Sequence, residues 1–421
     1  MTEQPARRLT LDLSPLRDSP RWRLLWGGHL VGFLGSQITV IAVGWQVYSL
    51  THSSLAVGLI GAVELVPLMV LGLVGGALAD AHDRRTILVL CDSTQLLLAG
   101  VLALNAWSDH PRLWVVYVMA AGISGTSALA QPALWAMTAR LVRPEQYPAA
   151  SALESTGWNL GAIVGPAMAG VLIHVFGLPA TFLVNVASLT VAVLSLARLG
   201  PVPPADGAPR MSLRAIADGF SFLKGKPIIR GTYLIDFIAM VFGMPRALFP
   251  AIAARLGGGS GTYGWLAAAP AAGAFAATLL SGWTARVHRY GLAVTIAVLT
   301  WGGAIALFGL SRWVWLAVAC LVVAGAADLV SVIFRRTIWN TLIPDEFRGR
   351  LGGIAWVNVR GGPVLGDIES GVVARLWSPA VSATSGGLLC IAGVVVMAVL
   401  VPSFNRYDRR SEPSPTTTSA A

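Results

Sequence analysis

The chain has 421 residues, of which 55% are hydrophobic and only 12% are charged. Soluble domains carry about 25% charged residues, so the composition excludes a water-soluble globular fold and indicates a polytopic membrane protein. The three cysteines are far apart and inside apolar runs, and the six histidines lack metal-ligand spacing. We therefore predict no disulfide framework, no metal site and no cofactor.

Residues 1–23 are polar and basic and lack the apolar core of a cleavable signal peptide, which predicts a cytoplasmic tail. Behind this tail come apolar runs long enough to cross the hydrocarbon core, which requires about 20 residues. Twelve such runs are present, at 24–49, 55–78, 86–107, 113–137, 150–176, 179–199, 229–252, 262–284, 291–311, 313–334, 351–376 and 382–402.

A linker at 200–228 divides these runs into two sets of six. It combines a Pro/Gly-rich stretch with a short amphipathic helix that we expect on the cytoplasmic membrane surface. The predicted fold is all-α, with one six-helix bundle at 24–199, a second at 229–402 and a disordered cytoplasmic tail at 403–421.

The two halves are weakly similar to each other. Residues 143–166 and 343–366 align with an offset of about 200 residues, and in both segments a proline, an acid and an aromatic residue precede a glycine-bearing span. Internal repeats with a site at their interface are typical of secondary transporters.

Basic residues predict that both chain ends are cytoplasmic. With this orientation the cytoplasmic segments hold 24 of the 30 Arg and Lys residues, and Arg335 is counted among them. The outer segments hold four, which are Arg112, Arg255, Arg312 and Arg375. The other two, Arg246 and Arg360, lie within spans. This asymmetry follows the positive-inside rule. The net charge of +10 is therefore explained by membrane topology, and no nucleic-acid partner is predicted.

A short segment rich in charged residues, GGALADAHDRR at 75–85, follows the second span. It resembles the loop signature of the major facilitator superfamily, although Ala81 and Asp83 depart from the usual form. The matching residues are Gly76, Leu78, Ala79, Asp80, Arg84 and Arg85. The resemblance implies that Gly76 lets two helices approach closely, and that Asp80 with Arg84 and Arg85 forms a charge cluster that holds the cytoplasmic side shut. The alternative is an ordinary loop whose arginines only fix topology.

Small residues recur every four positions in the fifth span, in GWNLGAIVGPAMAG at 157–170. They predict a smooth groove for a partner helix and a local bend at the proline. The segment resembles the antiporter motif of drug-exporting facilitators, with Ala169 in place of part of the usual glycine pair. Its residues are Gly157, Gly161, Gly165, Pro166 and Gly170. The alternative is small-residue packing, which is common in membrane bundles.

Three later segments, 231–253, 346–353 and 366–388, look like the enterobactin-exporter branch of this superfamily, whose relatives include macrolide efflux proteins. The resemblance implies a monomeric transporter of the cell membrane, with a small-molecule substrate, protons and the lipid bilayer as partners. We expect a proton-driven exporter of a small amphipathic or anionic molecule of the siderophore type, working by alternating access. Multidrug or macrolide efflux is the alternative, followed by a non-transporting sensor or assembly partner; an enzyme is not predicted.

Acids inside spans are candidates for proton coupling, because charges in the hydrocarbon persist mainly where they face a cavity or a partner. The deepest are Glu64, Asp236 and Asp367, whereas Asp92 and Asp328 lie nearer span ends and are interpreted as structural.

Two arginines within spans are candidates for binding an anionic substrate. Arg360 and Asp367 are seven residues apart, on one helical face, and Arg246 shares the seventh span with Asp236. Such an arginine would pair with an acid at rest and with the cargo when the acid is protonated; the alternative is a permanent structural ion pair. Gln37, Gln131 and Asn159 are further candidates, as hydrogen-bonding groups in the cavity.

Overall fold

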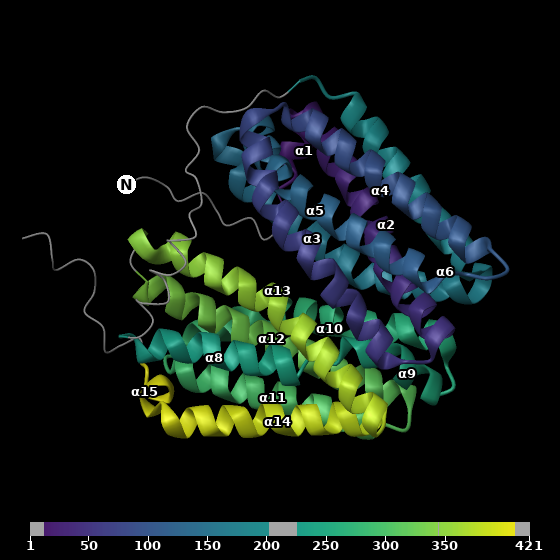
Figure 1. Cartoon of the computed structure of the whole chain (residues 1–421). Helices are drawn as coiled ribbons and strands as arrows, with labels where there is room; N and C mark the ends of the chain where they lie inside the picture. The colour runs from purple at the N-terminus through teal and green to yellow at the C-terminus, as the bar shows by residue number, and fades with distance from the viewer. Residues whose placement is uncertain (1–11, 202–224, 344, 409–421) are drawn as a thin grey trace, which may run out of the picture. The chain divides into compact units, whose positions relative to one another are not determined.

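The computed structural model describes residues 12–201, 225–343 and 345–408. For helical residues 73, 76, 77, 79, 80, 139, 345, 346, 348–350 and 352–357 it describes the backbone alone. Every regular element in the described ranges is a helix (Figure 1). Most of the predicted linker, with its amphipathic helix, and most of the C-terminal tail lie outside the described residues.

Contacts between residues divide the chain into two compact units. The first unit comprises Met1–Val43 and Val66–Pro209, and the second comprises Gly44–Leu65 and Arg210–Ala421. The division therefore falls within two helices, so that the adjoining ends of the first two spans pack with the second half of the chain.

The elements before the linker follow the predicted runs closely. In chain order they are α1 (Ser14–Asp18), α2 (Pro20–Thr51), α3 (Ser54–Ala81), α4 (Arg84–Trp107), α5 (Leu113–Leu141), η1 (Pro144–Gln146) and α6 (Tyr147–Ala197). Helix α6 contains two predicted spans. They are joined at Gly177, whose φ of 78° lies in the left-handed region that glycine adopts without strain.

The elements after the linker form the rest of the second unit (Figure 1). They are α8 (Pro227–Phe242), η2 (Arg246–Leu248), α9 (Phe249–Arg255), α10 (Gly259–Leu279), η3 (Ser281–Arg286), α11 (Tyr290–Leu310), α12 (Val314–Leu342), α13 (Asp345–Leu376), α14 (Pro379–Leu400) and α15 (Pro402–Asn405). Helix α11 packs against α12 and α14, while α13 packs against α8.

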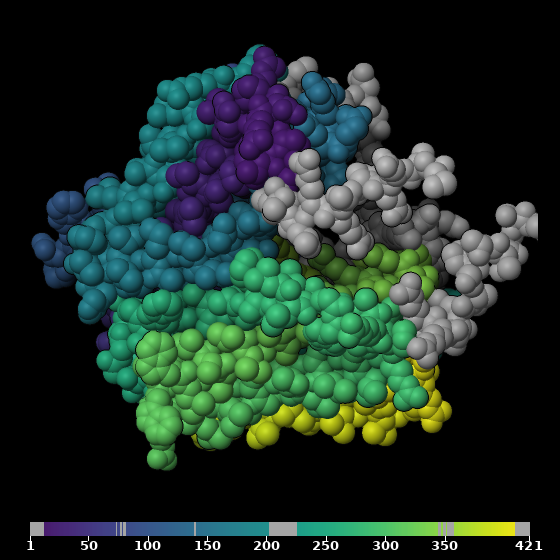
Figure 2. Space-filling view, turned by 180° about the vertical axis from the view of Figure 1, so that it is seen from behind, coloured from purple at the N-terminus to yellow at the C-terminus, as the bar shows by residue number. Residues whose placement is uncertain are grey.

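Nine stretches of the described chain are long and apolar enough to cross a membrane, by length and composition. One of them, Pro144–Ala197, contains both arms of α6, and two further long helices are α10 and α13. Together they account for the twelve predicted crossings. Helices α10 to α12 form much of the surface of the second unit that Figure 2 shows. On α11, the apolar side chains of Ile296 and Leu307 are more than half exposed. Such a surface suits contact with lipid.

Glycines set the packing of the first unit. Gly157, Gly161 and Gly165 are buried on α6. A β-carbon at these positions would meet Leu30, Phe33 and Gln37 of α2, respectively. This close approach between helix backbones is what a row of small residues permits.

We expect Gly165→Ala to destabilise the protein. The added β-carbon would lie 2.5 Å from the Gln37 Cβ, which moves only with the α2 backbone. Overpacking of this kind costs about 1–3 kcal/mol of unfolding free energy. Gly100→Ala on α4 is the control, because no atom lies within 4 Å of its β-carbon position and alanine favours a helix. Thermal unfolding in detergent measures both variants, and equal stability of the two would contradict the packing argument.

Candidate functional site: two charged clusters in the second unit

The predicted seventh span, 229–252, is broken in the structure. Helix α8 ends at Phe242 and the chain resumes a helical course at Arg246, after Gly243 and Pro245. Proline lacks an N–H and disfavours helix in the residue before it. The indole N–H of Trp301 donates to the Gly243 carbonyl oxygen at 2.5 Å. The bundle itself therefore supplies a hydrogen-bond partner for this backbone group at the break. Discontinuous helices of this kind often carry substrate and ion sites in transporters.

The break presents Arg246 to an acid on α13. Arg246 Nη2 lies 3.4 Å from Asp367 Oδ2, and the Ala247 backbone N–H donates to Asp367 Oδ1 at 3.0 Å. The Asp367 side chain is 12% exposed, whereas that of Arg246 is 50% exposed. Glu64 of α3 interacts electrostatically with both residues. We call Glu64, Arg246 and Asp367 the Arg246 cluster.

Two further groups border the Arg246 cluster. Arg360 of α13 interacts electrostatically with Arg246, and because both groups are cationic this interaction is repulsive. Tyr263 of α10 interacts with Asp367 and Arg246 and is almost fully buried. Its ring stacks on Trp45, with centroids 5.9 Å apart. The Arg246 cluster and its two neighbours thus combine two acids, two arginines and an aromatic wall.

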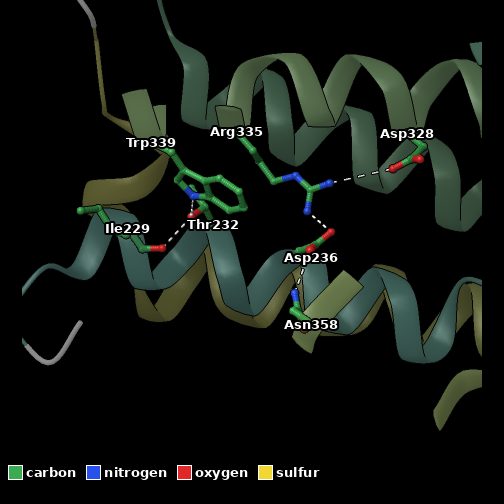
Figure 3. Close-up of polar contacts among 7 residues, drawn as sticks. All are labelled: Ile229, Thr232, Asp236, Asp328, Arg335, Trp339 and Asn358. Atoms are coloured by element: carbon green, nitrogen blue, oxygen red, sulfur yellow. Dashed lines mark hydrogen bonds and ion pairs between the residues drawn. The ribbon is translucent and has the colours of Figure 1, made fainter. Parts of the chain in front are cut away.

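A second charged group joins α8, α12 and α13 (Figure 3). Arg335 forms an ion pair with Asp236 and lies 3.9 Å from Asp328 through Nη2. Asn358 donates to Asp236 Oδ2 at 2.7 Å. Asp236 and Arg335 are both buried, whereas the Asp328 side chain is 32% exposed. We call Asp236, Asp328, Arg335 and Asn358 the Arg335 cluster.

Helices α8 and α12 make further contacts one helical turn away from the Arg335 cluster. Trp339 donates through Nε1 to Thr232 Oγ1 at 2.6 Å, and Thr232 donates to the Ile229 carbonyl (Figure 3). Thr232 precedes Asp236 by four residues, and Trp339 follows Arg335 by four, so each pair shares a helical face. The Tyr233 ring stacks on Trp339 at 4.9 Å. These contacts fix the register of α8 against α12.

The structure pairs the charges differently from the sequence prediction. Asp367 pairs with Arg246 rather than with Arg360 on its own helix, and Asp236 pairs with Arg335 rather than with Arg246. The charge count assigns Arg335 to the cytoplasmic side, but the structure buries it within α12. A signal was available: Asp328 and Arg335 are seven residues apart, the same spacing that drew attention to Arg360 and Asp367.

The predicted gating residues lie in the first unit. Gly76 and Asp80 are near the end of α3, and their side chains are outside the described part of the structure. Arg84 begins α4 and is buried. Arg85 donates to the carbonyl oxygens of Leu196 and Ala197 at 3.0 and 2.6 Å, which stabilises the end of α6.

The predicted polar substrate residues Gln37, Gln131 and Asn159 lie on α2, α5 and α6 of the first unit, and all three are half-buried. Gln37 packs against Gly165, so part of its surface is taken up by helix packing. Among the residues described, no three His, Cys, Asp or Glu side chains are grouped so as to hold a metal ion.

Comparisons with known proteins agree with this architecture. The model of the family of transmembrane secretion effectors matches residues 10–418. The enterobactin exporter EntS of Escherichia coli strain K12 is 29% identical over 411 residues, covering 96% of this chain and 97% of that protein. The exporter of the same name from Shigella boydii serotype 18 is 30% identical over 396 residues, covering 93% and 94%. The crystal structure of the nucleoside transporter NupG matches with a TM-score of 0.69 at 14% identity, covering 91% of this chain and 99% of that chain.

The helical fold and these relatives define a secondary transporter of the major facilitator superfamily, a multi-pass membrane protein and not an enzyme. The chain belongs to the family of transmembrane secretion effectors. The predicted resemblance to the enterobactin-exporter branch is confirmed over almost the full length of the chain.

Proposed function

We propose that this transporter exports a small anionic molecule of the siderophore type in exchange for protons, by alternating access. The named activity of the relatives supports the direction and the class of cargo. The observation that carries the proposal is the Arg246 cluster, in which a half-exposed guanidinium on a broken helix faces two acids. The guanidinium provides charge-assisted donors for an anionic oxygen of the cargo.

Proton exchange requires that cargo and protons exclude each other. An arginine released by protonation of its acid would bind an anion together with a proton, and both would then move the same way. The carboxylates supply the exclusion instead. Hydroxyl groups of the cargo donate the stronger, charge-assisted hydrogen bonds to Glu64 and Asp367 while these acids are ionised. A proton that arrives from outside occupies the same oxygen and displaces the cargo.

The membrane potential is sufficient to drive this exchange. One elementary charge that crosses 100 mV releases about 2.3 kcal/mol, which sustains a cargo gradient of about fifty-fold per proton. Proton entry and anion exit move charge in the same electrical direction, so both are favoured by a negative interior.

The wider arrangement belongs to the same proposal, and the charge asymmetry of the chain supports its orientation. Both termini lie in the cytoplasm, and a single copy works as a monomer in the lipid bilayer, with bundles at 24–199 and 229–402. Gly157, Gly161, Gly165, Pro166 and Gly170 form the antiporter-like groove, and Gly76, Asp80, Arg84 and Arg85 form the cytoplasmic latch. Arg246 and Arg360 contact the cargo, with Gln37, Gln131 and Asn159 as neutral contacts from the first unit.

We expect Asp80→Asn to reduce transport severalfold and leave membrane insertion intact. The amide keeps the size of the side chain but removes the charge that holds the latch. Flux in proteoliposomes, normalised to the amount of inserted protein, measures the effect. Wild-type flux from the correctly inserted variant would refute the latch.

The decisive experiment compares a deletion strain with its parent under iron limitation. We expect the deletion strain to secrete less of one iron-chelating molecule and to regain secretion with the plasmid-borne gene. Purified protein in vesicles should then accumulate that molecule only when a pH gradient or a membrane potential is imposed. New sensitivity to macrolides without loss of a secreted chelator would favour the efflux alternative. Vesicles that move no cargo of any kind would favour the sensor alternative.

A further inference from the structure

A polar pocket of about 660 Å³ lies at one end of the second unit. Its walls come from two helix connections and from α9. Helix α2 ends and α3 begins at one wall, with Tyr48, His52 and Ser54, while α13 gives way to α14 at the other, with Arg375 and Pro379. No predicted site residue lines this pocket, and the comparisons assign nothing to it.

The two connections are held together by close backbone contact. A β-carbon at Gly371 would meet the backbone of Ser54 and Leu55, so the end of α13 lies directly on the start of α3. His52 adopts a φ of 49° and donates its N–H to the Tyr48 carbonyl at 2.7 Å, which closes the last turn of α2. The His52 and Tyr48 rings meet edge to face, with centroids 5.9 Å apart.

The lining of the pocket suits an anion that carries an aromatic ring and hydroxyl groups. Arg375 is exposed, and the ion pairs of the described residues leave it without an acidic partner. Among the described residues that line the pocket there is no Asp or Glu. A guanidinium binds carboxylate or phenolate oxygens in a forked geometry, and the Tyr48 and His52 rings offer surfaces for stacking. Ala374 and Pro379 add apolar surface to the lining.

The pocket also lies in line with the Arg246 cluster. Asp367 and Arg375 are both on α13, and eight residues of helix span about 12 Å. Ala374 follows Asp367 by seven residues and so shares its helical face. With the chain ends in the cytoplasm, the helix connections of this pocket are on the outer side of the membrane.

We propose that this pocket is a second cargo site at the outer end of the pathway, which binds a small anionic hydroxylated aromatic molecule between Arg375, His52 and Tyr48. The inference rests on the proposed export function for its direction, but not for the binding itself. Cargo released from the Arg246 cluster would occupy this pocket before it leaves.

A cysteine introduced into the pocket tests the proposal without any transport assay. The native Cys91, Cys320 and Cys390 are buried, so Ala374→Cys supplies the reactive thiol. A membrane-impermeant maleimide should label this variant from outside intact cells. We expect 2,3-dihydroxybenzoate to slow the labelling, and neutral catechol to slow it much less, since catechol lacks the carboxylate that pairs with Arg375.

Matched arginine variants locate the binding. When Arg375→Gln is added to the Ala374→Cys variant, the concentration of 2,3-dihydroxybenzoate that halves the labelling rate should rise about tenfold. This is the effect expected from loss of one charge-assisted hydrogen bond. Arg312→Gln, an exposed arginine predicted on the same side, should leave it unchanged. Absence of outside labelling, equal protection by inorganic phosphate, or an equal effect of both arginine variants would each overturn the proposal. Protection in a protein that exports no hydroxylated aromatic anion from vesicles would support the pocket and refute the proposed cargo.

Discussion

Asp236→Ala is expected to lower the free energy of unfolding by about 3–5 kcal/mol, because it leaves the buried Arg335 without its carboxylate. Both partners of this pair are almost inaccessible to water, with Asp236 3% and Arg335 6% exposed. The remaining acid near the guanidinium, Asp328, is 3.9 Å away and partly exposed, so it compensates weakly. Thermal unfolding of the purified protein in detergent measures the loss.

Two companion variants make this first prediction specific. Asp236→Leu combined with Arg335→Met removes both charges, and such a replacement is often neutral, so the double variant should regain most of the stability. Glu154→Ala also deletes one acid, but it breaks a single partly buried hydrogen bond to Thr138 and should cost about 1 kcal/mol. A double variant as unstable as Asp236→Ala would show that the two charges do not act as a pair.

Asp367→Asn is expected to reduce export driven by a pH gradient about 100-fold. The amide keeps the size of the side chain and an acceptor for the Ala247 N–H, but it removes the charge next to Arg246 and the site of proton exchange. Losing the charge-assisted contact with Arg246, worth about 1.5–3 kcal/mol, corresponds to roughly 10- to 150-fold, which covers an effect of this size. Flux into vesicles, measured with and without an imposed pH gradient, provides the readout.

Glu369→Gln is the matched control for Asp367→Asn, since it makes the same kind of change two residues along α13 on a half-buried side chain. We expect the control to keep most of its gradient-driven flux. The cargo affinity of Asp367→Asn also distinguishes two mechanisms of proton coupling. If protonation acts only by releasing Arg246, the amide variant should bind cargo more tightly. If proton and cargo compete for the carboxylate, the variant should bind cargo more weakly. Full gradient-driven flux in Asp367→Asn would remove this acid from the proton pathway.

Hydropathy was a good guide to the helices because the crossing of a bilayer is a local property of about 20 residues. The runs at 86–107 and 291–311 agree with α4 and α11 within about two residues at each end, within the usual uncertainty of helix boundaries. The break between α8 and α9 was missed, although Gly243 and Pro245 mark it in the sequence. Apolar content continues across this break, and hydropathy does not register a change in backbone direction.

The charged clusters, in contrast to the helices, were predicted only in part. Sequence spacing named Glu64, Asp236 and Asp367 as acids of interest, since any charge inside an apolar run is conspicuous. It assigned wrong partners because only residues on the same helix can be related by spacing. Arg335 was missed because the apolar run of α12 stops one residue before it, although the helix continues to Leu342. Burial of its charge depends on neighbouring helices.

The sequence by itself determined the membrane class, the approximate positions of the helices and the resemblance to the exporter branch, because these depend on local composition and short motifs. Only the tertiary structure decided which acid meets which arginine. The two groups of the Arg246–Asp367 pair are 121 positions apart in the chain, and Asn358 reaches Asp236 across 122. Contacts at such separations are set by how the helices pack, through their small residues and the breaks in their backbone, and no local pattern encodes that geometry.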